Sequence, residues 1–375
     1  MDLSHVPAID HHAHNLLTAE AAAATPFRAA FTEGYDPAVI ERHAGNTLFY
    51  RRSVRDIAAL LGCDPTEDAV LARRAELGPD ELAARCFRAA NLEAVLIDDG
   101  FLPGRIRPLE WHAQFVPVRR VLRIESLAED LLGVSATFDD FMSRFTAALD
   151  PPPANVVALK SIAAYRSGLD IRPLSREAAE PSWRLWKEHT GPDRRPRLTN
   201  KVLLNYVVLE ALERAAKRRL PVQFHTGFGD PDLDLRMASP LHLRPVLENP
   251  RFREVPIVLL HASYPFAREA GYLASVYPNA YLDLGLAVPF LSVAGMRSAA
   301  GMLLELAPFS KLMYSSDAHL VPELYYLGAK WGREVLGWCL EQAVFDGDLT
   351  GSEADEVAAA VLRGNARALY GLERL

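Results

Sequence analysis

The chain has 375 residues, of which 50% are hydrophobic and 24% charged, the balance of an ordinary soluble globular protein. Its 41 basic residues against 48 acidic ones give a net charge of −7, which argues against nucleic-acid or anionic-membrane binding, because both need a basic face. Three cysteines without a CxxC pair exclude a disulfide framework, and no signal peptide or run of about 18 apolar residues is visible, so a cytoplasmic location is expected.

Short apolar runs, several ending in a polar or charged residue, recur along the chain with helical patterns between them. Runs without strict alternation are typical of parallel strands covered on both faces. Eight of them predict an α/β fold of the (β/α)8, or TIM-barrel, type, with a doubly wound open sheet as the alternative. The expected strands are Val6–Asp10, Ala94–Asp98, Val118–Glu125, Val156–Lys160, Val222–His225, Ile257–His261, Ala280–Leu284 and Leu312–Ser316.

The spacing of these strands is uneven, and more than 80 residues separate the first from the second. We therefore expect residues 1–375 to form a single barrel domain, with a helical insertion at about 15–90 lying over the mouth at the carboxyl ends of the strands. The helical patterns in the insertion are Thr18–Ala24, Val54–Leu61, Ala69–Leu77 and Glu81–Ala90.

The first expected strand ends in Asp10-His11-His12-Ala13-His14. Because alternate side chains of a strand share a face, His12 and His14 point the same way and can share a metal ion, whereas His11 faces the opposite side. The plain alternative is three solvent-exposed histidines in a loop.

Three further strand ends carry residues typical of metal ligands. His225 closes the fifth strand, His261 closes the sixth, and Asp317 follows the eighth. Each has a simple explanation alone, such as a hydrogen-bonded histidine or, for Asp317, a helix N-cap. Together, four imidazoles and a carboxylate on one barrel rim predict a site for a divalent metal. Zinc is the expected metal, with manganese, iron or nickel as alternatives.

Lys160 ends the fourth expected strand after four apolar residues, so it should be buried with a partner. Three interpretations are open: a salt bridge at the mouth, a contact to an anionic substrate, or carboxylation by CO2, which would turn the amine into a metal-bridging carboxylate. The third needs a lowered lysine pKa, which burial and nearby metal ions supply.

In this order, these residues are the pattern of the amidohydrolase superfamily, which the sequence resembles over nearly its whole length. The resemblance is greatest to the branch that contains the amidohydrolase-like half of fungal and plant proteins fused to a glutamine synthetase domain. No glutamine synthetase segment follows in this sequence, so no role that depends on that fusion is carried over. The segments that carry the branch resemblance are Lys160–Leu169, Phe224–Asp230, Leu260–Phe266 and Tyr314–His319.

The resemblance implies that His12, His14 and Asp317 hold one metal, and that His225 and His261 hold a second, bridged by Lys160 if this lysine is carboxylated. In the branches with one metal, the histidine after the fifth strand joins the first site and the next histidine contacts water or substrate. The sequence leaves one or two metals per chain open.

Metal chemistry then suggests the mechanism. A metal ion lowers the pKa of bound water towards about 7, which produces hydroxide at neutral pH. Asp317 can accept the proton and later deliver it to the leaving group, so Asp317 and His261 are the candidate catalytic residues. Substrate-binding candidates are Tyr165, Arg166 and His319, and the arginine could clamp a substrate carboxylate.

The leading functional hypothesis is a metal-dependent hydrolase that cleaves a C–N, amide-type bond of a small carboxylate-bearing substrate. A γ-glutamyl-type amide rests only on the branch resemblance. The alternatives are a metal-dependent non-oxidative decarboxylase or sugar-acid isomerase of the same superfamily, and a non-catalytic ligand-binding barrel. The expected partner is a small-molecule substrate rather than nucleic acid or membrane. A homodimer is an open alternative, because members of the superfamily often dimerise.

Overall fold

The computed structural model describes residues 1–190 and 196–373, and its centre is a sheet of eight parallel strands. Neighbouring strands pair in chain order from β1 to β8. This order confirms the predicted (β/α)8 architecture and excludes a doubly wound sheet, in which the strand order reverses. The strands are β1 (Ala8–His14), β2 (Leu92–Asp98), β3 (Val118–Arg123), β4 (Val156–Ser161), β5 (Val222–Phe224), β6 (Ile257–Leu259), β7 (Ala280–Asp283) and β8 (Leu312–Met313).

Backbone hydrogen bonds between β1 and the segment after β8 nearly close the barrel. The amide of Asp317 donates to the carbonyl of His12 at 3.0 Å, and the amide of His14 donates to the carbonyl of Ala318 at 2.7 Å. These bonds form because β1 runs four residues beyond the expected end at Asp10, so the histidine motif lies within the strand. Closure therefore joins residues about 300 positions apart in the sequence at the carboxyl end of the barrel.

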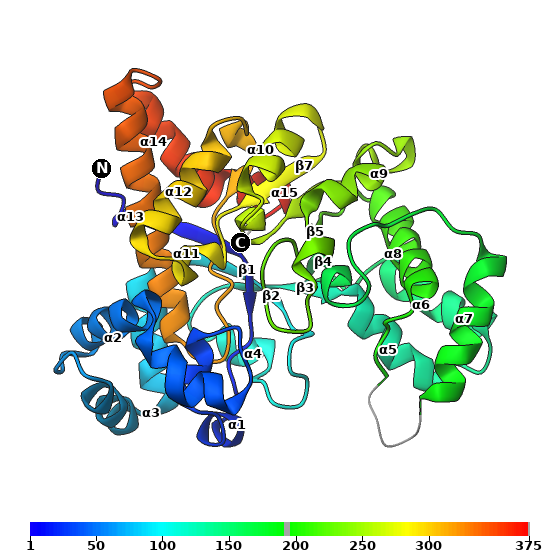
Figure 1. The fold of residues 1–375 in the computed structure, drawn as a ribbon, viewed down its shortest axis with the longest axis horizontal. Helices are drawn as coiled ribbons and strands as arrows, with labels where there is room; N and C mark the ends of the chain where they lie inside the picture. The colour runs from blue at the N-terminus through cyan, green and yellow to red at the C-terminus, as the bar shows by residue number, and fades with distance from the viewer. Residues whose placement is uncertain (191–195, 374–375) are drawn as a thin grey trace.

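Helices surround the strands, with α1, α2 and α3 of the insertion on one side of the barrel and α5 to α8 on the other (Figure 1). Among the described residues, no helix has both the length and the apolar character needed to cross a bilayer. The helices are α1 (Ala19–Ala23), α2 (Leu48–Leu61), α3 (Glu67–Ala90), α4 (Leu109–His112), α5 (Ile124–Val134), α6 (Phe138–Leu149), α7 (Arg176–His189), α8 (Lys201–Ala216), α9 (Arg244–Leu247), α10 (Ala267–Val276), α11 (Ala287–Phe290), α12 (Val293–Leu304), α13 (Glu323–Asp346), α14 (Gly351–Ala359) and α15 (Asn365–Leu369).

An N-cap residue and a glycine explain where α2 begins and where α3 bends. The Thr47 hydroxyl accepts a hydrogen bond from the amide of Tyr50 at 3.0 Å, and this N-cap starts α2 six residues before the expected position. The two helices expected over 69–90 are parts of α3, which kinks at Gly78, where φ is +71°. Glycine allows this angle without strain, and Pro79, which lacks an N–H, follows as the first residue of the second half.

One apolar cluster lies outside the barrel wall, and a second lies inside it. The larger fills the space between the strands and the outer helices. The smaller fills the barrel interior with side chains of strands β1, β2, β3, β4, β6 and β8, such as Ile9 of β1, and Tyr370 and Leu372 join it from the C-terminal segment. Figure 1 shows this end of the chain near the centre of the sheet. The carboxyl ends of the strands therefore lie above a filled barrel.

Candidate metal centre

The end of β1 and the segment after β8 place two imidazoles against one carboxylate. His12 Nε2 lies 3.2 Å from Asp317 Oδ1, and His14 Nε2 lies 3.3 Å from the same oxygen. All three residues are buried. The backbone hydrogen bonds between β1 and the segment after β8 hold this arrangement. The expected first metal site therefore forms only when these two distant parts of the chain pair.

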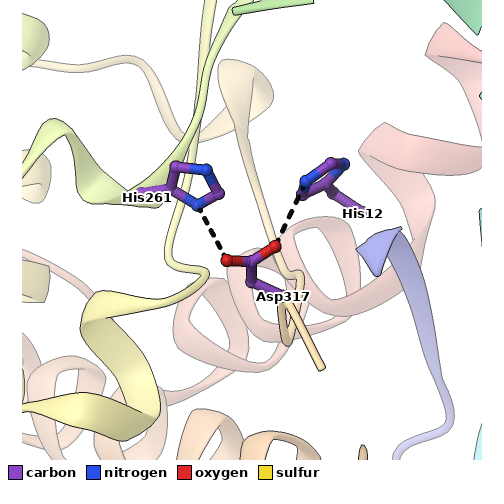
Figure 2. A group of neighbouring side chains, drawn as sticks. All are labelled: His12, His261 and Asp317. Carbon is purple, nitrogen blue, oxygen red and sulfur yellow. Dashed lines mark ion pairs between the residues drawn. The ribbon is translucent and has the colours of Figure 1, made fainter. Parts of the chain in front are cut away.

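His261 approaches the other side of the same carboxylate. Its Nδ1 lies 3.7 Å from Asp317 Oδ2, and Figure 2 shows the carboxylate between the rings of His12 and His261. His261 has a φ of +70°, which is unusual for a residue with a side chain. Asp283 of β7 stabilises this conformation, because its Oδ1 accepts the amide of His261 at 2.5 Å. One ligand atom from each of His12, His261 and Asp317 lies within 4.8 Å of the others, as a shared metal would require.

The hydrogen-bond partners of two imidazoles fix their tautomers. His12 Nδ1 lies 2.8 Å from the side-chain oxygen of Gln223, and His14 Nδ1 lies 3.0 Å from the carbonyl oxygen of Asp98. Both oxygens can only accept, so each Nδ1 carries a proton, and in a neutral ring Nε2 is then the nitrogen with a free lone pair. The nitrogens that could bind a metal are therefore the two Nε2 atoms, and both lie beside Asp317 Oδ1.

Two further observations fit a divalent metal at this position. His261 Nδ1 and Asp317 Oδ1 are buried without a hydrogen-bond partner, a condition that calls for an explanation in a native structure. Burial lowers the pKa of His12 to about 4, with Lys160 adding to the effect, and burial holds the pKa of His261 well below its usual range. The imidazoles of His12 and His261 are therefore neutral at pH 7, the state in which histidine binds metal.

Lys160 lies beside this group at the end of β4. Its Nζ is 3.1 Å from His12 Nε2, and the side chain is buried. No carboxylate among the described residues lies within ion-pair distance of this amine, so the salt-bridge interpretation is wrong. Burial lowers the pKa of Lys160 to about 8, although Asp98 and Asp317 oppose the shift. This shift makes the neutral amine, the form that reacts with CO2, more accessible.

The two other histidines of the sequence pattern have different surroundings. His225, directly after β5, packs its ring 4.4 Å from that of His261, and its Nε2 donates to the carbonyl of Phe228 at 3.0 Å. Only Nδ1 of His225 is then left for a metal. His11 was expected on the face of β1 opposite to His12, but it also lies inside the barrel, where its ring packs against Tyr370 with centroids 5.7 Å apart. The regular alternation of faces fails here because the pairing of β1 is irregular between Asp10 and Ala13.

A cavity of about 650 Å³ opens above these residues. Its floor includes Lys160, His261 and Asp317, and its walls include residues of the insertion from Thr25 to Ile40 and the loop after β2. The helical insertion thus contributes directly to the mouth of the barrel. A cavity of this size suits a small-molecule ligand.

The three predicted substrate-binding residues all line this cavity. The Tyr165 ring lies 4.3 Å from that of His225, and His319 Nδ1 lies 3.0 Å from the carbonyl of Asp317. Arg166 is already paired, because its Nη2 lies 3.2 Å from Glu129 Oε1. Its Nε is buried without a hydrogen-bond partner, so part of the guanidinium keeps its hydrogen-bonding capacity.

Several residues at the centre were missed by the sequence analysis. Gln223 interrupts the apolar run of β5, and a polar residue inside a buried strand was the available signal. Arg123 of β3 lines the cavity and binds Asp98 through Nη2 at 2.7 Å and Nε at 3.0 Å. Glu33 projects from the insertion into the cavity, where burial raises its pKa to about 8. No pattern in the sequence marks Glu33, because its position depends on the path of the insertion.

Comparisons with known proteins agree with this geometry. The family model described as Amidohydrolase matches residues 129–372. Protein fluG of Emericella nidulans is 33% identical over 401 residues, an alignment that covers 98% of this chain and 46% of fluG. The chain therefore spans about half the length of this curated relative.

Solved structures share the fold. A structure from Lactobacillus casei ATCC 334, provisionally designated a metal-dependent hydrolase, has 30% identity and a TM-score of 0.87, covering 100% of this chain and 98% of that one. A glucuronate isomerase from Caulobacter crescentus has 15% identity and a TM-score of 0.68, with 99% and 92% coverage. A uronate isomerase from Thermotoga maritima has 14% identity and a TM-score of 0.66, with 98% and 95% coverage. At such identities, the likeness to the isomerases concerns the fold alone.

Proposed function

This chain belongs to the amidohydrolase family, and on that premise we propose that it is a metal-dependent hydrolase that cleaves a C–N, amide-type bond of a small carboxylate-bearing substrate. The observation that carries the proposal is the convergence of His12 Nε2 and His14 Nε2 on Asp317 Oδ1 at 3.2 and 3.3 Å. The Lys160 amine lies 3.1 Å from His12 Nε2, but Asp317 Oδ1 is buried without a hydrogen-bond partner, and a cation between these atoms would offset the cost of burying them.

The donor set supports a divalent metal. His12, His14 and Asp317 would hold one ion, and neutral imidazole with carboxylate suits zinc, manganese or iron. Of these, zinc is the metal we favour. A second ion would use His261 and the free Nδ1 of His225. Two-metal binding would require carboxylation of the buried lysine at the end of β4, for which the lowered lysine pKa is favourable.

A bound divalent metal supplies Lewis acidity and water activated at neutral pH. The side chains of the chain would perform the proton transfers and orient the substrate. Asp317 would accept a proton on Oδ2, which faces the cavity side near His261, and return it to the leaving nitrogen. His261 would orient the reacting group, since its backbone is held by Asp283.

The cavity also offers cationic groups for a substrate carboxylate. Arg166 uses Nη2 for Glu129 and keeps its Nε unpaired, and Arg105 reaches the cavity with its Nη2 3.1 Å from the Thr25 hydroxyl. A guanidinium can bind a carboxylate through two parallel hydrogen bonds. We assign Tyr165 and His319 to contacts with the remainder of the substrate, because both line the same cavity.

A one-metal enzyme, either a non-oxidative decarboxylase or a sugar-acid isomerase, is the second candidate. It is favoured by the close grouping of His12, His261 and Asp317, whose ligand atoms lie within 4.8 Å of one another, as a single ion would require. The two candidates differ in product rather than in fold, so assays of products distinguish them.

The experiment is a product screen with zinc- or manganese-reconstituted protein. Carboxylate-bearing amides, including γ-glutamyl amides, should release amine in a reaction that stops on chelation. Release of CO2 from carboxylic acids, or isomerisation of uronates without any amide hydrolysis, would overturn the hydrolase proposal in favour of the second candidate. Metal binding with no turnover on any of these panels would favour a ligand-binding barrel.

A further inference from the structure

The C-terminal segment reaches the metal centre from below. Helix α15 ends at Leu369, and the next residue, Tyr370, enters the apolar cluster inside the barrel. The Tyr370 ring stacks on that of His11 with an interplanar angle of 21°. Both side chains are buried. The hydroxyl of Tyr370 thus lies inside the barrel, next to His11, which directly precedes the candidate ligand His12 in the sequence.

Gln223 connects this hydroxyl to the metal centre. Its Nε2 lies 2.8 Å from the carbonyl oxygen of His11 and 3.0 Å from the hydroxyl oxygen of Tyr370. Its Oε1 lies 2.8 Å from His12 Nδ1. The Gln223 side chain has no exposed surface, so water does not substitute for these partners.

The directions of these hydrogen bonds follow from the chemistry of the groups. The carbonyl of His11 can only accept, so the amide nitrogen of Gln223 faces it, and the amide oxygen must face His12. The second N–H of Gln223 points to Tyr370, whose oxygen accepts it. The hydroxyl proton of Tyr370 then points to His11 Nδ1, 3.0 Å away. Each donor in this chain then has an acceptor, and His11 Nδ1 also lies 3.4 Å from Gln223 Nε2, a longer contact than either of the two hydrogen bonds of that nitrogen.

The orientation of Gln223 decides which nitrogen of His12 is free. With the amide oxygen toward His12, Nδ1 keeps its proton and Nε2 presents a lone pair to Asp317 and Lys160. A rotated amide would present N–H to Nδ1, which would move the imidazole proton to Nε2 and block that nitrogen as a ligand. Groups that form a hydrogen bond with the non-ligating ring nitrogen of a metal-bound histidine affect the affinity for the metal.

We propose that Tyr370 is a positioning residue for the metal centre: it holds Gln223, and Gln223 fixes the tautomer and ring orientation of His12. The inference rests on the proposed metal-dependent function, because it assigns His12 Nε2 to the metal. It gives the C-terminal segment a role in metal binding in addition to filling the barrel.

The first test measures the affinity of the metal-free protein for Zn²⁺ by competition with a chromophoric chelator. Tyr370→Phe keeps the ring in the core and removes the hydroxyl, and it should weaken zinc binding about tenfold, as expected for an outer partner of a ligand. Tyr314→Phe is the matched control, because Tyr314 is equally buried and its hydroxyl has no hydrogen-bond partner. The control should leave zinc affinity unchanged, and equal losses in the two variants would overturn the proposal.

The second test asks whether Tyr370 acts through Gln223. Gln223→Met should weaken zinc binding by about 10- to 100-fold, and adding Tyr370→Phe should weaken it no further. Gln223→Glu, which keeps an acceptor for His12 and loses the N–H groups, replaces Gln223→Met if that variant does not fold. Independent losses that multiply in the double variant, or an unchanged affinity in Tyr370→Phe, would refute the proposed role. Absence of zinc binding by the wild-type protein would instead refute the proposed function.

Discussion

Acid should weaken the fold through one buried histidine, His112 at the end of α4. Its Nε2 accepts the backbone amide of Leu16 at 3.0 Å, and its Nδ1 donates to the carbonyl of Pro108 at 2.9 Å. The ring has no exposed surface, and burial lowers its pKa to about 4 from the usual histidine value of about 6.5. Protonation would break the bond to Leu16, just beyond His14, where the chain leaves β1 for the insertion.

The size and sign of the change in folding stability follow from the lowered pKa of His112. Above pH 6.5 the ring is neutral in both the folded and unfolded states, and its full contribution to stability is present. Below pH 6.5 the unfolded state binds a proton that the folded state does not bind until about pH 4. At about 1.36 kcal/mol per pKa unit, the folded protein loses about 3 kcal/mol across this window.

The variant His112→Gln isolates this contribution. The glutamine oxygen can still accept the amide of Leu16 but does not titrate, and loss of the Pro108 bond should cost about 1 kcal/mol at pH 7. At pH 4 the variant should be more stable than the wild type by about 2 kcal/mol, so the two stability curves cross near about pH 6.

The assay is urea unfolding of the metal-free proteins, followed by tryptophan fluorescence from pH 7 to 4. His43→Gln, at an exposed histidine, is the control and should follow the wild type. A difference between His112→Gln and the wild type that does not change with pH would refute the assignment of His112 as a neutral buried acceptor.

Three further predictions concern the metal centre and cavity. Asp317→Asn in the metal-reconstituted protein should lower kcat by about 10²- to 10⁴-fold, whereas the exposed control Asp64→Asn should not; an unchanged kcat would remove Asp317 as the proton acceptor. Lys160→Met should lower the metal content measured by elemental mass spectrometry if the lysine bridges two ions, whereas full metal content with lost substrate binding would make it a substrate contact. Arg166→Ala should raise KM about tenfold or more for carboxylate-bearing substrates, and an unchanged KM across all of them would contradict the carboxylate clamp.

The barrel and the candidate ligands could be predicted from the sequence because parallel strands bring their carboxyl ends to one rim. The apolar runs marked the strands, and polar residues directly after them, such as Lys160 and His225, marked the rim. The boundary of β1 was wrong by four residues at its carboxyl end, because its last residues pair with the segment after β8, which lies far away in the sequence. The local pattern of apolar and polar residues carries no information about that pairing.

Other parts of the site depend on contacts that no local pattern records. Glu33 reaches the cavity through the path of the insertion, and Tyr370 reaches His11 from the opposite end of the chain. His112 follows none of the expected strands, yet it is buried and holds the backbone beside the candidate ligand His14. A polar residue within an apolar run, as at Gln223, is the kind of local conflict that signals such a role.

The central claim is that His12, His14 and Asp317 converge because they bind a divalent metal. The most direct test is the metal content per chain, measured by elemental mass spectrometry on protein produced with added zinc or manganese and bicarbonate. The account predicts bound metal in the wild type and its loss in His12→Ala, with two ions per chain indicating a carboxylated Lys160 and one ion indicating a free amine. Metal-replete protein that contains no metal, or His12→Ala that retains all of it, would contradict the account.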